Sequence, residues 1–338
     1  MRVVQLISHK QDTMCGVMDY TKQLVQALKA EQTTEVSIYR LETWSLKALW
    51  DLRKKYKNQN DVIFHVQYPS VGMGLSPAPF LLPIFFSKNK VFITLHEFSS
   101  FNLFRKLYAL VFEVFRKKII FTNEPERLQY EKFFPWAKAN HAIIPIGNNI
   151  DVVQAETAQN QAPRLIYFGQ IVKNKGIEEF IETVKLLRQR GSTIPCVIMG
   201  ALIDKELNQQ ISSAAKEFEI ECLYNLSAEE VSRELSRSSI ALLLFEGGVS
   251  DKRGSAIACL KHGVAVITRH SDLTSDWWKI ATYSANRIED SVSLIEDITT
   301  GKKDRIPDPV ILKDALQHRE WDHIARKHMD LYESRQTH

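Results

Sequence analysis

The sequence predicts an α/β protein with two doubly wound, Rossmann-like parallel sheets, each in its own domain. Short β-rich runs alternate with longer amphipathic runs along most of the chain, and this alternation is typical of parallel sheets covered by helices on both faces. The chain has 338 residues, which is enough for two domains of ordinary size. A polar run without periodicity, DVVQAETAQNQAP, interrupts the alternation near the middle and indicates a linker.

In the first half, β-branched and aromatic residues cluster in short runs that indicate strands. After the first run, Val17, Tyr20, Leu24 and Leu28 repeat at helical spacing, so the first crossover is expected to be a helix. The strands are expected at residues 3–7, 36–39, 62–66, 91–95, 119–122 and 142–144.

The alternation restarts after the linker. Strands are expected at residues 165–168, 196–199, 221–223, 241–244 and 264–268, and helices at about 173–190, 204–218 and 228–235, after Gly254, and at about 312–332. The expected organisation is a first domain of residues 1–150, a linker of 151–162, a second domain of 163–311, and a C-terminal helix within 312–338 that packs back on the first domain. Open α/β sheets bind ligands beyond the carboxyl ends of their strands, so the active site is expected in a cleft between the domains.

The composition is that of a globular protein, because 44% of the residues are hydrophobic and 25% are charged. No run of 18 apolar residues predicts a membrane-spanning helix. The opening MRVVQLISHK is interpreted as a first strand and not as a signal peptide. The four cysteines have no CxxC spacing, which indicates neither a zinc site nor a disulfide framework. A cytoplasmic protein is therefore expected.

Charge is distributed unevenly along the chain. Residues 1–150 hold 20 Lys and Arg against 12 Asp and Glu, whereas the remainder holds 24 against 28. A basic half indicates an anionic partner, which is a membrane surface, a nucleic acid or an anionic substrate. Simple drift in surface composition is the alternative.

Several familiar motifs are missing from the sequence. There is no GxxxxGK[ST] phosphate loop, no GxSxG elbow and no Asp-x-Asp pair, and the pair Gly72 and Gly74 lacks the third glycine of a dinucleotide fingerprint. No cofactor and no metal are therefore expected. His318, His323 and His328 are spaced by five residues, so they do not share a helix face, and they are expected to be solvated.

Two features of the first half are candidates for a site. Gly16 opens the first helix, where a glycine lets the backbone approach a ligand and the helix N-terminus attracts an anion. His96 closes an apolar strand in Thr94-Leu95-His96-Glu97, and a histidine at a strand's carboxyl end can bind a hydroxyl or stabilise charge. A turn glycine and a surface histidine are the alternatives.

Two further candidates lie in the second half. Gly169 ends the first strand of that domain, and Lys175 follows near the next helix start, where a lysine can hold a phosphate. Residues 245–255, FEGGVSDKRGS, join a buried strand to a helix through glycines and then Lys252 and Arg253. Backbone N–H groups, a guanidinium and a helix N-terminus would converge there, which is an anion site made without metal. A solvated lysine and a purely structural loop are the alternatives.

In this order, the segments CGVMDYTKQLVQAL, TLHEF, IIPIGNNID, YFGQIVKNKGIEEFIE and FEGGVSDKRGSAIACLKHGVAVIT resemble those of retaining glycosyltransferases with the GT-B fold. This is the group 1, family 4-like class, and the last segment resembles a subgroup with a GGVSDKRGS-type loop. The resemblance covers nearly the whole chain. It implies a nucleoside-diphosphate sugar donor, UDP- or GDP-linked, bound mainly by the second domain. It also implies a glycan or lipid-linked acceptor on the first domain, no metal, no nucleic-acid partner, and a role in bacterial surface polysaccharide or glycolipid synthesis.

The resemblance also implies roles for individual residues. His96, Lys175 and Arg253 would act in catalysis, with His96 at the transferred sugar and the two cations on the diphosphate. The donor and its phosphates would be held by Gly16, Gly169, Gln170, Glu246, Ser250, Asp251, Lys252, Gly254 and Ser255. Two departures matter. Gln170 stands where the family usually has Arg, and Ser250 and Ala258 stand where it usually has two glutamates. The second glutamate usually holds the ribose of the donor, and Ala258 has no carboxylate for that contact.

The segment from Phe101 to Lys118, FNLFRKLYALVFEVFRKK, is expected to be an aromatic-rich helix with basic ends. Similar enzymes often sit on the inner membrane surface, so this segment is a candidate for peripheral contact with anionic lipid. An ordinary domain helix is the alternative. For the protein as a whole, a nucleotide-sugar epimerase and a catalytically silent nucleotide-binding subunit are the alternative functions.

Overall fold

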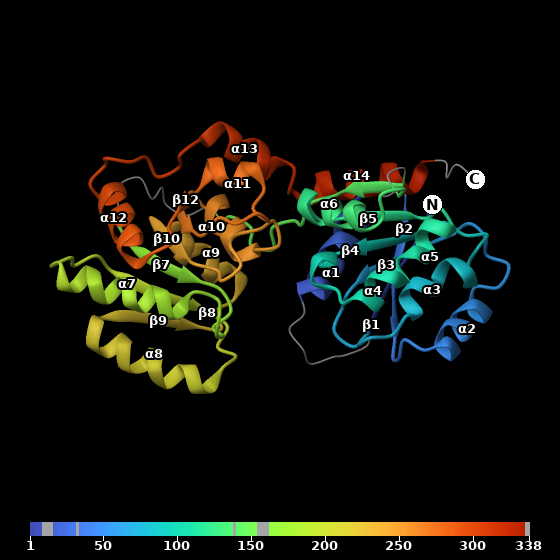
Figure 1. The fold of residues 1–338 in the computed structure, drawn as a ribbon, viewed down its shortest axis with the longest axis horizontal. Helices are drawn as coiled ribbons and strands as arrows, with labels where there is room; N and C mark the ends of the chain where they lie inside the picture. Colours follow the sequence, from blue (N-terminus) through green and yellow to red (C-terminus); the bar gives the residue numbers. More distant parts are fainter. Residues whose placement is uncertain (9–15, 32–33, 138–139, 154–161, 335–338) are drawn as a thin grey trace. The chain divides into compact units, whose positions relative to one another are not determined.

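The computed structural model describes residues 1–8, 16–31, 34–137, 140–153 and 162–334. The chain forms two compact units (Figure 1). Unit 1 consists of Met1–Gly147 together with His318–His338, and unit 2 consists of Asn148–Gln317. The expected class, α/β with doubly wound parallel sheets, is confirmed.

Unit 1 is built on a parallel sheet of order β2-β1-β3-β4-β5-β6. Its elements are β1 (Arg2–Ser8), α1 (Gly16–Ala30), β2 (Glu35–Leu41), α2 (Leu46–Lys55), β3 (Val62–Tyr68), α3 (Ala78–Phe85), β4 (Val91–Leu95), η1 (Phe98–Ser100), α4 (Leu103–Tyr108), α5 (Leu110–Val114), β5 (Lys118–Phe121), α6 (Glu124–Phe133), β6 (His141–Ile143) and α14 (Trp321–Glu333).

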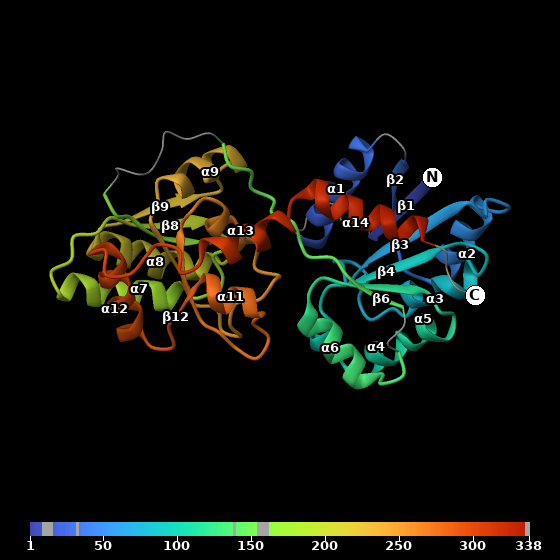
Figure 2. The ribbon, with the colours of Figure 1, turned by 90° about the horizontal axis from the view of Figure 1, so that it is seen from above.

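Side chains of the unit 1 strands alternate between two apolar clusters, one on each face of the sheet. Val3, Ile63 and Phe92 pack with α1 and α14, whereas their neighbours Val4 and Phe64 pack with α2, α3 and α6. The C-terminal helix α14 lies alongside α1 (Figure 2). This helix belongs to the core of unit 1, because Ile324, Ala325 and Tyr332 are fully buried and pack in the same apolar cluster as Val3.

Unit 2 is built on a parallel sheet of order β12-β11-β10-β7-β8-β9. Its elements are β7 (Leu165–Phe168), α7 (Ile177–Gln189), β8 (Cys196–Gly200), α8 (Lys205–Phe218), β9 (Ile220–Tyr224), α9 (Ala228–Ser236), β10 (Ile240–Leu243), α10 (Gly254–Lys261), β11 (Ala265–Thr268), α11 (Asp276–Ala281), β12 (Tyr283–Ser284), α12 (Ile288–Thr299) and α13 (Pro309–Gln317).

Three expectations are wrong at the level of single elements. The segment from Phe101 to Lys118 is not one helix: α4 and α5 are separated at the buried Ala109, and Lys118 already begins β5. The expected C-terminal helix is two helices, α13 and α14, which lie in different units. His328 is not solvated but fully buried, because α14 packs on the sheet.

The helix expected from about residue 173 begins at Ile177. Gly176 precedes it with a φ of 88°, a left-handed conformation that favours glycine. Gly176 also packs against the end of β10, because a Cβ atom added there would lie 2.7 Å from the carbonyl oxygen of Leu244. Part of the linker, residues 154–161, lies outside the described residues, and so do Met14 and Cys15.

Gly176→Ala is expected to destabilise unit 2 more than Gly191→Ala does. Both glycines flank α7 with similar positive φ, so each alanine carries a left-handed cost of roughly 1–2 kcal/mol. Only the alanine at 176 also collides with backbone, which adds on the order of 1–3 kcal/mol, whereas Gly191 has nothing within 4 Å. Equal losses in the free energy of unfolding, measured with denaturant, would contradict the packing argument.

Candidate functional site

In the sheet of unit 2, the order in which the chain adds strands reverses between β7 and β10. The chain runs from β7 to β8 and β9 on one side, and then returns to place β10 on the other side of β7. In open α/β sheets, ligands bind beyond the carboxyl ends of the strands at such a point. The loops that begin at Gly169 and at Leu244 follow these two strands, so they form the candidate site of unit 2.

The loop after β7 lies against the start of α10. A Cβ atom at Gly169 would be 3.6 Å from Oγ of Ser255, the second residue of that helix. The hydroxyl of Tyr167 donates a hydrogen bond to the carbonyl oxygen of Gln170 at 3.1 Å, which fixes the loop, while the Gln170 side chain is exposed. The structure therefore brings Gly169, Gln170, Gly254 and Ser255 to one place, at a helix N-terminus with N–H groups that can bind an anion.

Arg253 immediately precedes α10, and its half-buried guanidinium stands 4.5 Å from the centre of the Phe245 ring. Burial raises the pKa of Tyr167, nearby Glu178 and Glu179 raise it further, and Arg253 opposes them. Arg253 therefore lies close enough to the end of β7 to interact electrostatically with Tyr167. A cation beside a helix N-terminus is suited to a phosphate or diphosphate.

Lys175 is half-buried and directly precedes Gly176, whose backbone touches that of Leu244 at the end of β10. This contact brings the backbone at Lys175 to the same edge of the sheet as Gly169. Lys175 and Arg253 therefore both belong to the carboxyl-end loops of the strands where the sheet reverses.

The rest of the glycine-rich loop is anchored by Asp251. This carboxylate is 4% exposed and accepts hydrogen bonds from the hydroxyl of Ser275 and from Nε1 of Trp277, the latter at 2.8 Å. Its oxygens thus hold the loop to the start of α11. Glu246 is exposed, whereas Ser250 and Lys252 are half-buried.

Ala258 is fully buried in α10, so its side chain faces the core of unit 2.

In unit 1, His96 directly follows β4 and is 4% exposed. Its Nε2 donates a hydrogen bond to Oε1 of Gln67 at 3.0 Å, and its ring meets the ring of Tyr20 edge-on at 5.3 Å. Tyr20 lies one turn into α1, and Gly16 is the exposed first residue of that helix. The structure therefore brings His96 close to the first turn of α1.

The turn after His96 is held by a residue that the sequence analysis missed. Glu126 of α6 is 3% exposed and accepts hydrogen bonds from the backbone N–H and the hydroxyl of Ser99, both at 2.7 Å. Gln67 was missed as well. The available signal was the presence of two polar residues, His65 and Gln67, inside a strand that is otherwise mostly apolar, VIFHVQY.

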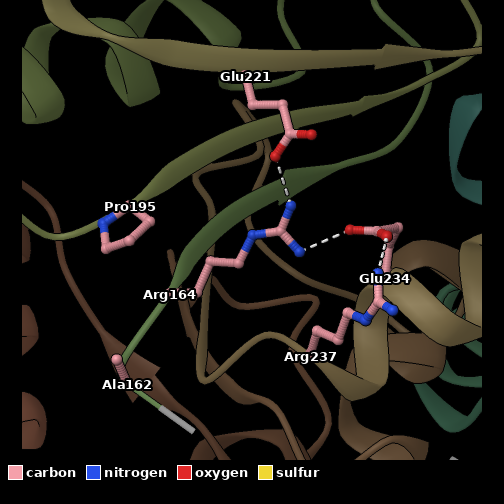
Figure 3. A pocket seen from close by; sticks show the side chains of 6 residues that line it. All are labelled: Ala162, Arg164, Pro195, Glu221, Glu234 and Arg237. Carbon is pink, nitrogen blue, oxygen red and sulfur yellow. Dashed lines mark hydrogen bonds and ion pairs between the residues drawn. The ribbon is translucent and has the colours of Figure 1, made fainter.

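A cavity of about 400 Å³ lies at the opposite edge of the unit 2 sheet, near the amino ends of β7, β8 and β9 (Figure 3). Arg164 pairs there with Glu221 at 2.7 Å and with Glu234 at 2.6 Å, and Arg237 pairs with Glu234 at 3.0 Å. These charges neutralise one another, and the cavity is not part of the candidate site.

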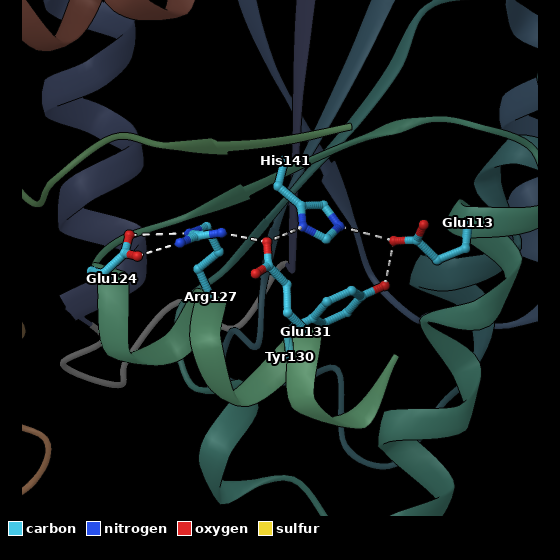
Figure 4. A network of polar contacts seen from close by, with 6 residues as sticks. All are labelled: Glu113, Glu124, Arg127, Tyr130, Glu131 and His141. Carbon is cyan, nitrogen blue, oxygen red and sulfur yellow. Dashed lines mark hydrogen bonds and ion pairs between the residues drawn. The ribbon is translucent and has the colours of Figure 1, made fainter. Parts of the chain in front are cut away.

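A second cluster of side chains joined by ion pairs and hydrogen bonds lies on α5, α6 and β6 (Figure 4). The His141 side chain is 2% exposed, with Nε2 3.1 Å from Glu113 and Nδ1 3.4 Å from Glu131. The hydroxyl of Tyr130 donates to Glu113 at 2.7 Å, and Arg127 pairs with Glu131 and with Glu124. Burial, together with Glu113, raises the pKa of Tyr130, so its hydroxyl stays a donor. His141 opens β6, so the cluster lies at the amino end of that strand and ties the helices to the sheet.

Within the part of the chain that the structure describes, no three His, Cys, Asp or Glu side chains gather as metal ligands. Nor does any helix among those residues have the length and apolar character needed to cross a membrane.

The chain is similar to known proteins in sequence over one segment and in fold over nearly its whole length. Residues 150–247 match the family described as glycosyl transferases group 1. Comparison with curated proteins gave no match. A glycosyltransferase from Rickettsia africae is 12% identical, with a TM-score of 0.74 over 98% of this chain and 97% of its own.

Two further solved structures are similar over nearly their whole length. A protein from Listeria monocytogenes with a provisional assignment as a UDP-N-acetylglucosamine 2-epimerase is 12% identical. Its TM-score is 0.68 over 99% of this chain and 98% of its own. WaaG, a glycosyltransferase involved in lipopolysaccharide biosynthesis, is 10% identical, with a TM-score of 0.63 over 99% and 100%. The chain therefore has the GT-B fold, and the segment that carries Gly169 and Lys175 matches glycosyl transferases group 1.

Proposed function

We propose that the protein is a retaining, metal-independent glycosyltransferase. It moves a sugar from a UDP- or GDP-linked donor to a glycan or lipid-linked acceptor in the synthesis of bacterial surface polysaccharide or glycolipid. The observation that carries the proposal is the site in unit 2, where the loop after β7, the N-terminus of α10 and Arg253 meet at the reversal of the sheet. The match of residues 150–247 supports glycosyl transfer as the reaction.

The chemistry explains why cations and N–H groups are needed. In glycosyl transfer, the bond between the anomeric carbon and a phosphate oxygen breaks, and its electron pair leaves with the diphosphate. Charge on that oxygen therefore grows in the transition state, while the sugar gains oxocarbenium character. Arg253, Lys175 and the α10 N–H groups would stabilise the growing charge more than the ground state. The departing oxygen then takes the proton of the acceptor hydroxyl that forms the new bond.

His96 would contact the transferred sugar from unit 1. A neutral imidazole has one donor and one acceptor nitrogen and a protonated ring has two donors, and in His96 the Nε2 atom is already engaged with Gln67. Gly16, the first residue of α1, would let the backbone approach the diphosphate.

Two alternatives are kept as outcomes of the same experiment. The similarity to the Listeria monocytogenes structure favours an epimerase as the second candidate, and the missing glutamates would suit a silent nucleotide-binding subunit. A panel of nucleotide sugars, followed by mass spectrometry and NMR with EDTA present, separates them. Transfer with retained anomeric configuration supports the proposal. Epimerisation of the free donor would indicate an epimerase instead, and binding without turnover would indicate a silent nucleotide-binding subunit.

We further propose contact with anionic lipid through the exposed apolar side chains of α4 and α5. The exposed fractions of Phe104 and Val114 are 70% and 68%, and Arg116, which follows α5, is also exposed. The basic contribution is smaller than the sequence indicates, because Lys117 is buried and donates to the carbonyl oxygens of Ser87 and Asn89. Buried apolar area would therefore contribute more than charge.

Lys175→Ala and Arg253→Ala are each expected to weaken binding of the nucleoside diphosphate and to lower turnover by roughly tenfold or more, equivalent to about 1.4 kcal/mol. Each removes a cation from the proposed diphosphate site. Calorimetry and steady-state kinetics measure the two effects. Arg237→Ala, which removes a cation at the far edge of the same sheet, is the control and should leave both unchanged. Full activity of both site variants would refute the phosphate assignment.

His96→Ala is expected to abolish transfer while sparing nucleotide affinity, because His96 lies in unit 1 and the diphosphate is assigned to unit 2. Single-turnover assays and nucleotide titration give the two readouts. Unchanged turnover would remove His96 from the site.

Phe104→Glu combined with Val114→Glu is expected to reduce sedimentation of the protein with vesicles containing phosphatidylglycerol. The charges would oppose burial of this face in the headgroup region. Val310→Glu changes an apolar residue of unit 2 that is at least as exposed, and it serves as the control. Equal binding of both variants, or no binding of the unchanged protein, would count against lipid contact here.

A further inference from the structure

A row of polar side chains crosses the face of the unit 1 sheet that α1 and α14 cover. Gln5 pairs in register with His65 across β1 and β3, and Gln67 pairs with Thr94 across β3 and β4. These four are fully buried, and His96 continues the row at the carboxyl end of β4 with 4% exposure. Polar groups at such depth destabilise a fold unless they are hydrogen-bonded.

The two glutamines fix each other's orientation. Nε2 of Gln67 donates to Oε1 of Gln5 at 3.3 Å, so the amide oxygen of Gln67 points the other way, toward His96. That oxygen lies 3.0 Å from Nε2 of His96. An amide oxygen can only accept, so the hydrogen of this bond must be on Nε2 of His96.

The far end of the row is fixed by the C-terminal helix. The hydroxyl of Tyr332 on α14 lies 2.6 Å from Nδ1 of His65 and accepts a hydrogen bond from Gln5 at 3.1 Å. Nε2 of His65 lies 2.8 Å from the hydroxyl of Thr94. Burial, and then the charges of His328 and His96, lower the pKa of His65 well below its ordinary value, so this ring stays neutral and no charge disturbs the order of the amides.

We propose that Gln67 is a positioning residue that holds His96 in the tautomer protonated at Nε2 and fixes the plane of its ring. The tautomer and the plane of the ring concern the protein alone, whereas their effect on sugar transfer rests on the proposed function. Gln67 acts through His96 and is not itself placed in contact with a substrate.

The tautomer is measured directly on the full chain without substrate. In protein labelled with ¹⁵N-histidine, long-range ¹H–¹⁵N NMR spectra distinguish a protonated from a bare ring nitrogen. The His96 signals are assigned by their loss in His96→Asn. At a pH where the ring is neutral, His96 is expected to show a protonated Nε2. A protonated Nδ1 would overturn the proposal without any further variant.

Substitutions then separate positioning from mere packing. Gln67→Met keeps the length of the side chain but removes both polar ends, and it should mix the His96 tautomers. Gln67→Glu keeps an acceptor oxygen and should restore protonation at Nε2. Thr34→Val removes a buried hydroxyl that donates to Met329 of α14 outside this network, and it should leave the His96 pattern unchanged. An unaltered pattern in Gln67→Met, or an equal change in Thr34→Val, would overturn the assignment.

Kinetics extend the test to the reaction. Gln67→Met is expected to lower kcat severalfold with little change in the KM for the donor, because the ring no longer meets the transferred sugar in one orientation. Gln67→Glu should recover part of that loss. If the tautomer behaves as expected but the unchanged protein transfers no sugar, the proposed function fails and the positioning role of Gln67 stands.

Discussion

Direct packing of backbone against backbone holds the candidate site of unit 2 in place. A Cβ atom at Gly200 would lie 1.7 Å from the carbonyl oxygen of Gly169, and one at Gly176 would lie 2.7 Å from that of Leu244. No side chain fits in either contact, so a larger residue at either glycine would force apart the loops that follow β7, β8 and β10. The approach of Gly169 to Ser255, and with it the meeting of the loop after β7 with the N-terminus of α10, depends on this packing.

Most of the fold could be predicted from the sequence because a parallel sheet has a strong local signature. Buried strands between amphipathic helices are visible in runs such as VVQLIS and IALLL, and the predicted bounds differ from the observed ones by a residue or two. The prediction of a single helix from Phe101 to Lys118 was wrong because the segment is apolar on most sides. Its hydrophobic periodicity therefore could not show the break at Ala109. The burial of His328 depends on a sheet whose strands lie far earlier in the chain, between Arg2 and Ile143, which no local pattern reveals.

The candidate site was predictable to the extent that its residues stand at strand ends. Gly169, Lys175 and Arg253 follow buried strands, and the topology places such residues at one edge. The partners of these residues were not predictable. Gln67 meets His96 and Gln5 only because β1, β3 and β4 are neighbours in register, and Asp251 meets Trp277 through the fold of the α11 region, which the pattern did not indicate.

The place of α14 has a consequence for the order of events during synthesis. The helix completes the core around Val3 and Ile63 in unit 1, yet the ribosome makes it after every residue of unit 2. Unit 2 is a continuous stretch and can fold as soon as it emerges, whereas the N-terminal unit must wait with one apolar face uncovered. Such a face attracts chaperones and neighbouring chains, so the nascent polypeptide is most exposed to aggregation before its last helix docks.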